Sequence, residues 1–386
     1  MTAEVRGEAG ARVSSLDTLR AALVAWIIGG HALLGYSAVG GWAYDEVNEV
    51  TFAPAVEYGL TVLLGPSALF LMGTFFLVAG LLTPASLARK GPARFARDRS
   101  RRLGVPFVAS MLLVWPLFLW LAYLAAGQDV GYWWLLTGRE RTLDSGALWF
   151  AEVLLIFSLA YLLWRVFRSR RESRPAARPP LRSADLLWWV VGIAVAGFVV
   201  RLFFPARDTQ IGDLHLWQWP ILAGMFGLGI RYSGSGLATD VGDRLRRHSG
   251  VITLTTIVTL PAIALAVGVD NVAADAGRFL GGWRPEVMLL VTVEAVLVVF
   301  GSLWLLGFAQ RNFTGTGVIR AAAARGSFAA FVLQGPVLLM LATALRPFDA
   351  PAEVKAPLVA VLGIVLCFGL GWLITRDRSA RAPAAR

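Results

Sequence analysis

Three residues near the N-terminus, Asp17, Arg20 and His31, place chemically active groups in an otherwise apolar stretch. Arg20 and His31 are 11 positions apart, so a helix would carry both on one face, about 16 Å apart along its axis. A neutral imidazole can accept a proton, and a guanidinium can bind phosphate oxygens. The spacing therefore predicts a general base and an anion-binding group on one helix.

Each of these residues also has a purely structural interpretation. Residues 14–17 fit the Ser-x-x-acid pattern of a helix N-terminus, and Asp17 can pair with Arg20 three positions later. His31 could equally be a neutral histidine that is hydrogen-bonded between helices.

A second group of charges follows the second apolar stretch. Seven Lys and Arg residues lie between positions 89 and 102, and they include Arg99 and Arg102. They could simply anchor the chain at the cytoplasmic surface. Their density also suits a phosphate-rich ligand, because guanidinium groups bind phosphate oxygens in pairs.

A tryptophan and an acid open a later apolar stretch. Trp149 is typical of the aromatic belt at a membrane interface, with an orienting role as the alternative. Glu152, one helical turn further on, is either a buried hydrogen-bonded acid or a catalytic group. Arg201, Glu286 and Glu294 are further charges inside apolar stretches, and the sequence does not say which of them meet.

The composition says which elements must position these residues. Of 386 residues, 57% are hydrophobic and 16% are charged, and the mean hydropathy is +0.64, which excludes a soluble globular protein. One cysteine and three scattered histidines form no cluster with metal-ligand spacing, so we expect no metal site. The net charge of +11 would suggest nucleic acid, but the basic residues lie between apolar runs.

A membrane-spanning helix needs about 20 apolar residues, and ten stretches qualify. We therefore predict an all-α polytopic membrane protein with about ten transmembrane helices. The sixth stretch is interrupted by proline and glycines, so it could be broken or re-entrant. The ten stretches are 16–36, 57–83, 105–126, 147–167, 186–204, 214–232, 250–269, 286–308, 326–345 and 357–375.

Most of the Lys and Arg residues lie in alternate connecting segments. Because cytoplasmic loops of membrane proteins are rich in Lys and Arg, this distribution places both termini in the cytoplasm. It also explains the high positive charge without a nucleic-acid partner. We predict one domain over residues 1–386. It has a cytoplasmic N-terminal segment at 1–15, an Arg- and Pro-rich cytoplasmic loop at 168–185 and a cytoplasmic tail at 376–386.

Several short patterns, in this order, resemble those of the integral membrane acyltransferase-3 family. The motif-bearing part covers residues 13–165, and beyond it the likeness is mainly the number of helices. The patterns are Leu16-Asp17-x-Leu19-Arg20-Ala21, His31 ten residues later, Phe75-Phe76-x-x-Ala79-Gly80, Arg99-x-x-Arg102-Leu103-x-x-Pro106 and Leu148-Trp149-Phe150.

The resemblance implies an enzyme of the bacterial plasma membrane that moves an acyl group, often acetyl, from cytoplasmic acyl-CoA to a hydroxyl of a carbohydrate or glycosylated acceptor. It matches His31 to the family's essential histidine and Arg20 to its paired arginine. It matches Arg99 and Arg102 to the pair associated with the acyl-CoA donor. No tightly bound cofactor is implied.

The chain departs from the family pattern at two positions. Ala79 stands where serine is usual, and Gln334 stands where the pattern commonly ends in histidine, so no second histidine can titrate there. Asp17 is about 21 Å from His31 along a helix and cannot orient its imidazole, which leaves Glu152 or another acid for that role.

Other interpretations remain open at this point. His31 either acts as general base or forms a covalent acyl-imidazole intermediate. In a different class, the chain is a transporter or flippase of an envelope precursor, with His31, Glu152 and Glu294 as a polar pathway. A silent binding module is a third possibility.

Overall fold

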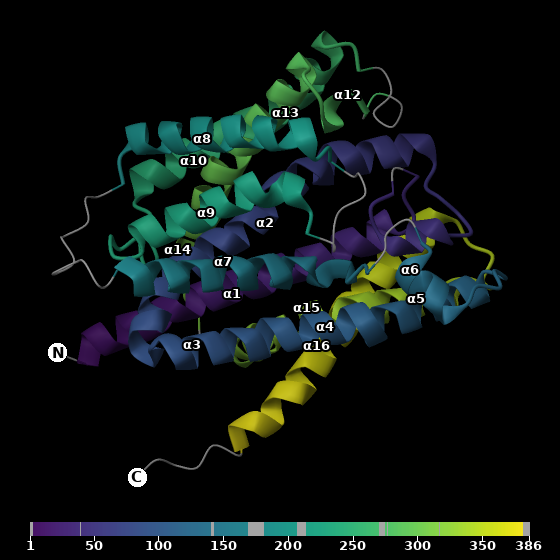
Figure 1. Cartoon of the computed structure of the whole chain (residues 1–386), viewed down its shortest axis with the longest axis horizontal. Helices are drawn as coiled ribbons and strands as arrows, with labels where there is room; N and C mark the ends of the chain where they lie inside the picture. Colours follow the sequence, from purple (N-terminus) through teal and green to yellow (C-terminus); the bar gives the residue numbers. More distant parts are fainter. Residues whose placement is uncertain are drawn as a thin grey trace. The chain divides into compact units, whose positions relative to one another are not determined.

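The computed structural model describes residues 3–38, 40–139, 143–168, 181–206, 214–269, 275, 277–315 and 317–380, and every regular element in these ranges is helical (Figure 1). The α-helices are α1 (Ala3–Leu34), α2 (Pro54–Lys90), α3 (Pro92–Arg99), α4 (Val105–Ala109), α5 (Trp115–Ala125), α6 (Tyr132–Thr137), α7 (Trp149–Arg168), α8 (Ser183–Phe203), α9 (Trp219–Tyr232), α10 (Asp243–Ala266), α12 (Gly277–Leu280), α13 (Pro285–Val296), α14 (Ser302–Asn312), α15 (Val318–Leu345) and α16 (Ala352–Ala380). π-Helical turns at Ser100–Gly104, Ser110–Val114 and Leu297–Gly301 join α3 to α5 and α13 to α14.

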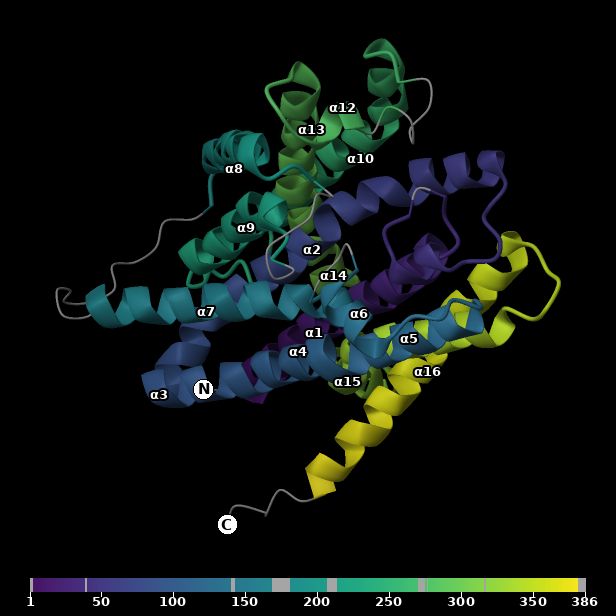
Figure 2. The same ribbon diagram turned by 45° about the vertical axis from the view of Figure 1, so that its right-hand side comes forward.

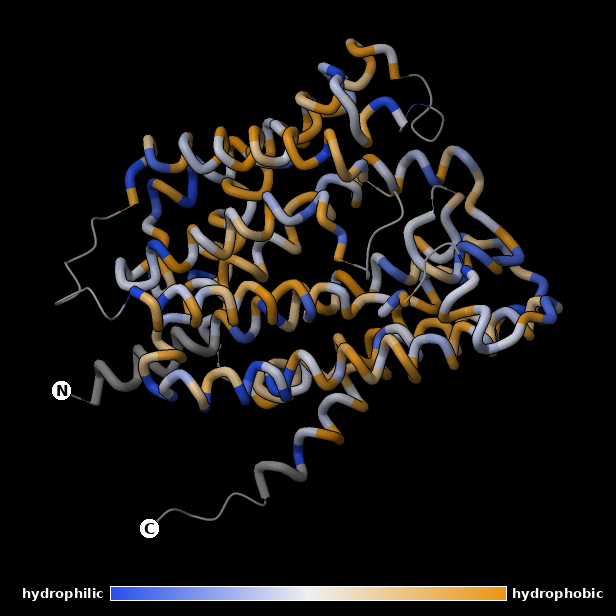
Figure 3. Tube along the Cα trace, in the orientation of Figure 1, coloured by the Kyte–Doolittle hydropathy of each residue, from blue (hydrophilic) through white to orange (hydrophobic). Residues whose placement is uncertain are grey.

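Nine helical segments among the described residues are long and apolar enough to cross a membrane. They correspond to nine of the ten predicted stretches, which confirms an all-α polytopic membrane protein. Figure 3 shows apolar residues along most of the length of these helices. The remaining stretch, at 214–232, forms only the 14-residue helix α9 after the short 3-10 helix Leu216–Gln218.

Helix α9, with 14 residues, is shorter than these nine segments. Ala53 directly precedes α2, and its N–H donates to Glu353 at the start of α16 over 2.8 Å. With its 3-10 turn, α9 extends for about 27 Å, close to the hydrocarbon thickness. The cytoplasmic location of both termini stays a prediction.

The chain ends differ from the predicted segments. Helix α1 begins at Ala3, so most of the predicted N-terminal segment 1–15 is helical, because polar residues can extend a helix beyond the bilayer without any hydropathy signal. Helix α16 likewise continues to Ala380 into the predicted tail 376–386. Residues 381–386 and positions 169–180 of the predicted loop 168–185 lie outside the described residues.

The chain divides into two compact units, and its organisation as one domain stays a prediction. Unit 1 comprises Met1–Thr61, Pro106–Phe150 and Phe313–Arg386. Its helices α1, α15 and α16 lie side by side in Figures 1 and 2. A Cβ atom on Gly371 would lie 2.6 Å from the carbonyl oxygen of Gly326, so α15 and α16 pack backbone against backbone.

Unit 2 comprises Val62–Val105 and Ala151–Asn312. Helix α2 meets α9 at glycines: a Cβ atom on Gly80 would lie 2.3 Å from the carbonyl oxygen of Phe226, and one on Gly229 would lie 2.4 Å from that of Leu77. Small residues of this kind let two membrane helices approach backbone against backbone. It fixes α9 against a long spanning helix.

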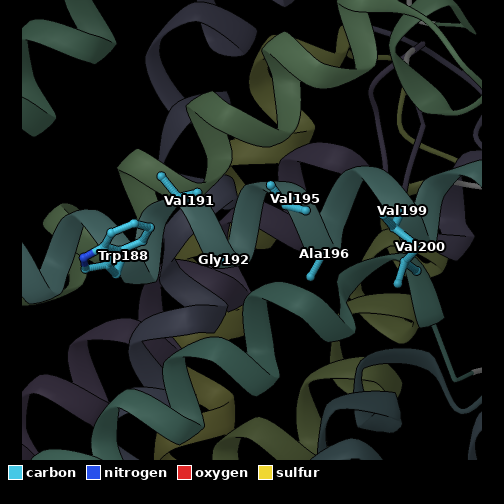
Figure 4. Close-up of a pocket in the computed structure, with 7 residues that line it drawn as sticks. All are labelled: Trp188, Val191, Gly192, Val195, Ala196, Val199 and Val200. Carbon is cyan, nitrogen blue, oxygen red and sulfur yellow. The ribbon is translucent and has the colours of Figure 1, made fainter.

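An apolar groove of about 490 Å³ runs along α8 in unit 2 (Figure 4). Trp188, Val191, Val195 and Val199 on this face are exposed, as expected for side chains that contact lipid. None of the predicted site residues lines the groove. Its lining residues are Trp188, Val191, Gly192, Val195, Ala196, Val199 and Val200.

Candidate functional site

His31 lies one turn before the end of α1 and is half-buried. Its Nδ1 is 3.0 Å from Oε1 of Gln334, which α15 supplies from within the core of unit 1. The indole of Trp42 stacks on the imidazole, with 4.2 Å between ring centroids and 10° between planes. The ring is thus held at one edge and on one face, and it keeps access to the surface.

Trp42 reaches His31 from the segment that follows α1. The chain turns at Gly40 and Gly41, whose φ values of 72° and 119° favour glycine. Trp115 packs against Trp42 with 5.2 Å between ring centroids. A Cβ atom on Gly146 would lie 2.8 Å from Trp115, so glycine is needed there to admit the indole.

A buried charge network holds the segment beyond Trp42. Glu49 accepts hydrogen bonds from the Lys355 ammonium and the Tyr44 hydroxyl, each over 2.7 Å. Burial acts to raise the pKa of Glu49, but these two bonds outweigh it and hold that pKa below its usual value. Burial, with help from Glu49, raises the pKa of Tyr44, so the phenol stays a donor.

A second buried charge, Arg139, ties the same segment to the loop before α7. Its Nη2 lies 2.6 Å from Asp144 and 3.4 Å from Glu46. Burial acts to lower the pKa of Arg139, but the two carboxylates raise it above its usual value, so the side chain remains a cation. Together the two networks fix the loop that carries Trp42.

The pattern Leu148-Trp149-Phe150 contacts α15 near the same place. Phe150 packs edge-on against Phe331, one turn before Gln334, with 5.6 Å between centroids. Trp149 is half-buried at the first residue of α7. Its orienting role stays a prediction.

Arg20 and Asp17 lie on α1 below His31. Their side chains form the predicted pair at 3.5 Å and are 42% and 44% exposed. The helix-capping interpretation of Asp17 is wrong, because α1 begins at Ala3 and Asp17 therefore lies in its interior. An exposed pair of this kind contributes about 0–1 kcal/mol, so Arg20 can exchange its partner for a ligand at little cost.

Arg99 and Arg102 belong to unit 2, at the junction of α3 with the π-helical turn. Asp98 pairs with both Arg102, at 2.8 Å, and Lys90, at 2.7 Å. The Arg102 side chain is 73% exposed, and Arg99 lies over the Phe95 ring at 5.3 Å. One carboxylate thus stands among several cations, which leaves net positive charge on this surface.

Glu152 lies in the first turn of α7, in unit 2. The residue is half-buried, and its Oε2 is buried with no hydrogen-bond partner among the described residues. A buried, unpaired carboxyl oxygen costs free energy, and such groups cluster at functional sites. Whether Glu152 is a structural acid or a catalytic group stays a prediction.

The other intramembrane charges pair with one another in unit 2. Nη2 of Arg201 donates to both carboxylate oxygens of Glu294, over 2.9 and 2.7 Å, and the side chains are 1% and 5% exposed. Glu286 pairs with Arg278 over 2.9 Å. Glu294 is thus held in a buried ion pair.

Sequence reasoning missed Trp42 and the contact that Gln334 makes. Trp42 lies in a loop, where no helical periodicity links it to His31. Gln334 stood out as a polar residue in an apolar helix at a position where histidine is common, and this was the available signal. Its hydrogen bond to His31 joins residues 303 positions apart.

Comparison with known proteins extends the likeness beyond the motif-bearing residues. A family described as an acyltransferase domain matches residues 13–376. Two relatives, both called glucans biosynthesis protein C, match 95% of this chain over 92% of their own length. The one from Salmonella heidelberg (strain SL476) is 29% identical, and the one from Salmonella schwarzengrund (strain CVM19633) is 30% identical. No solved structure matches the chain.

Proposed function

Because the chain belongs to the acyltransferase-3 family, we propose that it moves an acyl group, acetyl in the first instance, from cytoplasmic acyl-CoA to a hydroxyl of a carbohydrate or glycosylated acceptor. The observation that carries this proposal is the environment of His31. The imidazole is half-buried and is held by Gln334 and Trp42 in one orientation. Both relatives are named for glucan biosynthesis, which supports a carbohydrate acceptor.

His31 acts as the general base of the transfer. Its free ring nitrogen takes the proton of the acceptor hydroxyl while the oxygen attacks the thioester carbonyl carbon. The new C–O bond forms, the C–S bond breaks, and the CoA thiolate leaves and recovers the proton from the imidazolium. A positioned base of this kind contributes about 10²- to 10⁴-fold to the rate.

The arginines bind the donor. Arg20 shares the helix of His31, about 16 Å along the axis, a distance that an extended pantetheine arm spans. Arg99 and Arg102 supply positive charge for the phosphates of CoA, which guanidinium groups bind through paired hydrogen bonds. We assign Glu152, whose Oε2 is buried without a hydrogen-bond partner among the described residues, to the catalytic groups.

Release of the CoA thiol by the purified protein in detergent tests this proposal. We expect slow release from acetyl-CoA or a longer acyl-CoA by the wild type, and loss of that release in His31→Ala. Binding of the donor, followed by calorimetry, should survive in His31→Ala. The exposed His248 provides the matched control, because His248→Ala changes the same residue type outside the proposed site.

The outcomes separate the alternatives. A folded wild type that neither binds nor cleaves any acyl-CoA would overturn the proposal and favour a transporter. An acylated protein that accumulates with wild type and disappears with His31→Ala would replace the general base with an acyl-imidazole intermediate.

A further inference from the structure

The side-chain amide of Gln334 has a fixed direction. Its Nε2 is 3.1 Å from the carbonyl oxygen of Phe331, one turn earlier in α15, and Gln334 is fully buried. A carbonyl oxygen only accepts hydrogen bonds, so the group that faces it must be the amide NH2. The amide oxygen, Oε1, is therefore the atom that faces His31.

This direction determines where the imidazole carries its proton. The amide oxygen can only accept, so Nδ1 of His31, 3.0 Å away, must be the donor. In a neutral imidazole one nitrogen carries hydrogen and the other carries the lone pair. Nε2 is then the basic atom, on the side of the ring away from Gln334.

We propose that Gln334 is a positioning residue that holds His31 in its Nδ1–H tautomer and so presents Nε2 as the base; this inference rests on the proposed acyl transfer. Trp42 completes the arrangement, because stacking at 10° fixes the plane of the ring while Gln334 fixes its rotation within that plane. The partner is an uncharged amide, so it selects the tautomer without the charge of a carboxylate.

The tautomer can be measured without any assay of activity. The chain has three histidines, and His215→Asn with His248→Gln leaves His31 alone. Asparagine suits position 215, where φ is 47°. In this variant, labelled with 15N-histidine, proton–nitrogen couplings identify which ring nitrogen carries hydrogen. We expect Nδ1–H at a pH where the ring is neutral, and a predominant Nε2–H form would overturn the inference.

Turnover provides the second test, with two substitutions at Gln334. Methionine has similar length and no acceptor, so Gln334→Met should lower kcat for CoA release at least ~10-fold, within the range of a general base, with KM for the acyl-CoA unchanged. In Gln334→Glu, a carboxylate oxygen can accept from Nδ1–H, so most of kcat should return. The acidic limb of the pH–rate profile should then move to higher pH, because a carboxylate stabilises the imidazolium.

The results distinguish this inference from the proposed function. If Gln334→Met retains the wild-type kcat, or if both variants lose kcat equally while remaining folded, Gln334 does not position the base. If the Nδ1–H form is found but His31→Ala still turns over, acyl transfer by His31 fails while the assigned tautomer stands. If turnover needs His31 but the Nε2–H form predominates, only the present inference fails.

Discussion

Replacing Glu294 with glutamine is expected to destabilise unit 2 more than an ordinary substitution. Glutamine keeps the shape of the side chain but leaves the Arg201 guanidinium, which is 1% exposed, without a counter-charge. Removal of one partner from a buried ion pair costs about 3–5 kcal/mol. That is a factor of about 10² to 10⁴ in the unfolding equilibrium.

Removal of both charges should cost much less. The intact pair is incompletely satisfied, because Nε and Nη1 of Arg201 are buried without hydrogen-bond partners among the described residues. Replacing an imperfect buried pair with apolar residues is often neutral, or stabilising by about 1–4 kcal/mol. The double variant Arg201→Leu with Glu294→Leu should therefore be more stable than Glu294→Gln and close to the wild type.

The assay is the midpoint of thermal unfolding in detergent, followed by tryptophan fluorescence and by the soluble fraction on size exclusion after heating. Glu286→Gln is the matched control, because its pair with Arg278 is more exposed, and its midpoint should change little. A wild-type midpoint for Glu294→Gln would refute the reasoning. A double variant Arg201→Leu with Glu294→Leu that is no more stable than Glu294→Gln would refute it as well.

Three further predictions concern the packing and the charges. Gly80→Ala should destabilise the folded protein by about 1–3 kcal/mol in the same thermal assay, because the new Cβ atom would collide with backbone atoms of α9. The control is Gly192→Ala, where a Cβ atom would meet no atom within 4 Å. This variant should be neutral or stabilising by about 0.4–1 kcal/mol. The pKa of Glu49 is lower in the folded chain than its ordinary value of 4.5, so the ionised carboxylate stabilises the fold above pH 4.5. This stabilisation should be lost as the pH falls through the folded pKa. In Glu49→Gln, the midpoint of thermal unfolding should therefore depend less on pH in this acidic range. The double variant Arg99→Ala with Arg102→Ala should raise KM for acyl-CoA by ~10-fold or more and leave kcat nearly unchanged, because the role proposed for these arginines is to hold the donor and not the reacting atoms.

The bilayer explains why most helices could be predicted from the sequence. Each span needs a long apolar run, and that requirement is local, so nine segments match the predicted stretches. The predicted stretch 214–232, in which α9 lies, is not among these nine, because glycines that let α9 approach α2 also weaken its apolar signal. The polar helical extension that begins at Ala3 has no such signal either.

The site was predictable only where one helix carries it. Asp17, Arg20 and His31 share α1, so the regular rise and rotation of a helix are enough to relate their positions. The partners Trp42 and Gln334 come from a loop and from a helix near the other end of the chain. Their positions depend on tertiary packing, which neither spacing nor hydropathy encodes.

The interrupted course of unit 1 has a consequence for how the protein is made. His31 leaves the ribosome early, but the amide that hydrogen-bonds its ring is synthesised 303 residues later, after the whole of unit 2. Domains are generally completed in the order of their synthesis, and here the first helix must wait for α15 before its imidazole is held. A nascent chain that stops short of α15 therefore holds His31 without its partner. The hydrogen-bonded site around His31 is thus completed only late in synthesis, once α15 has been added.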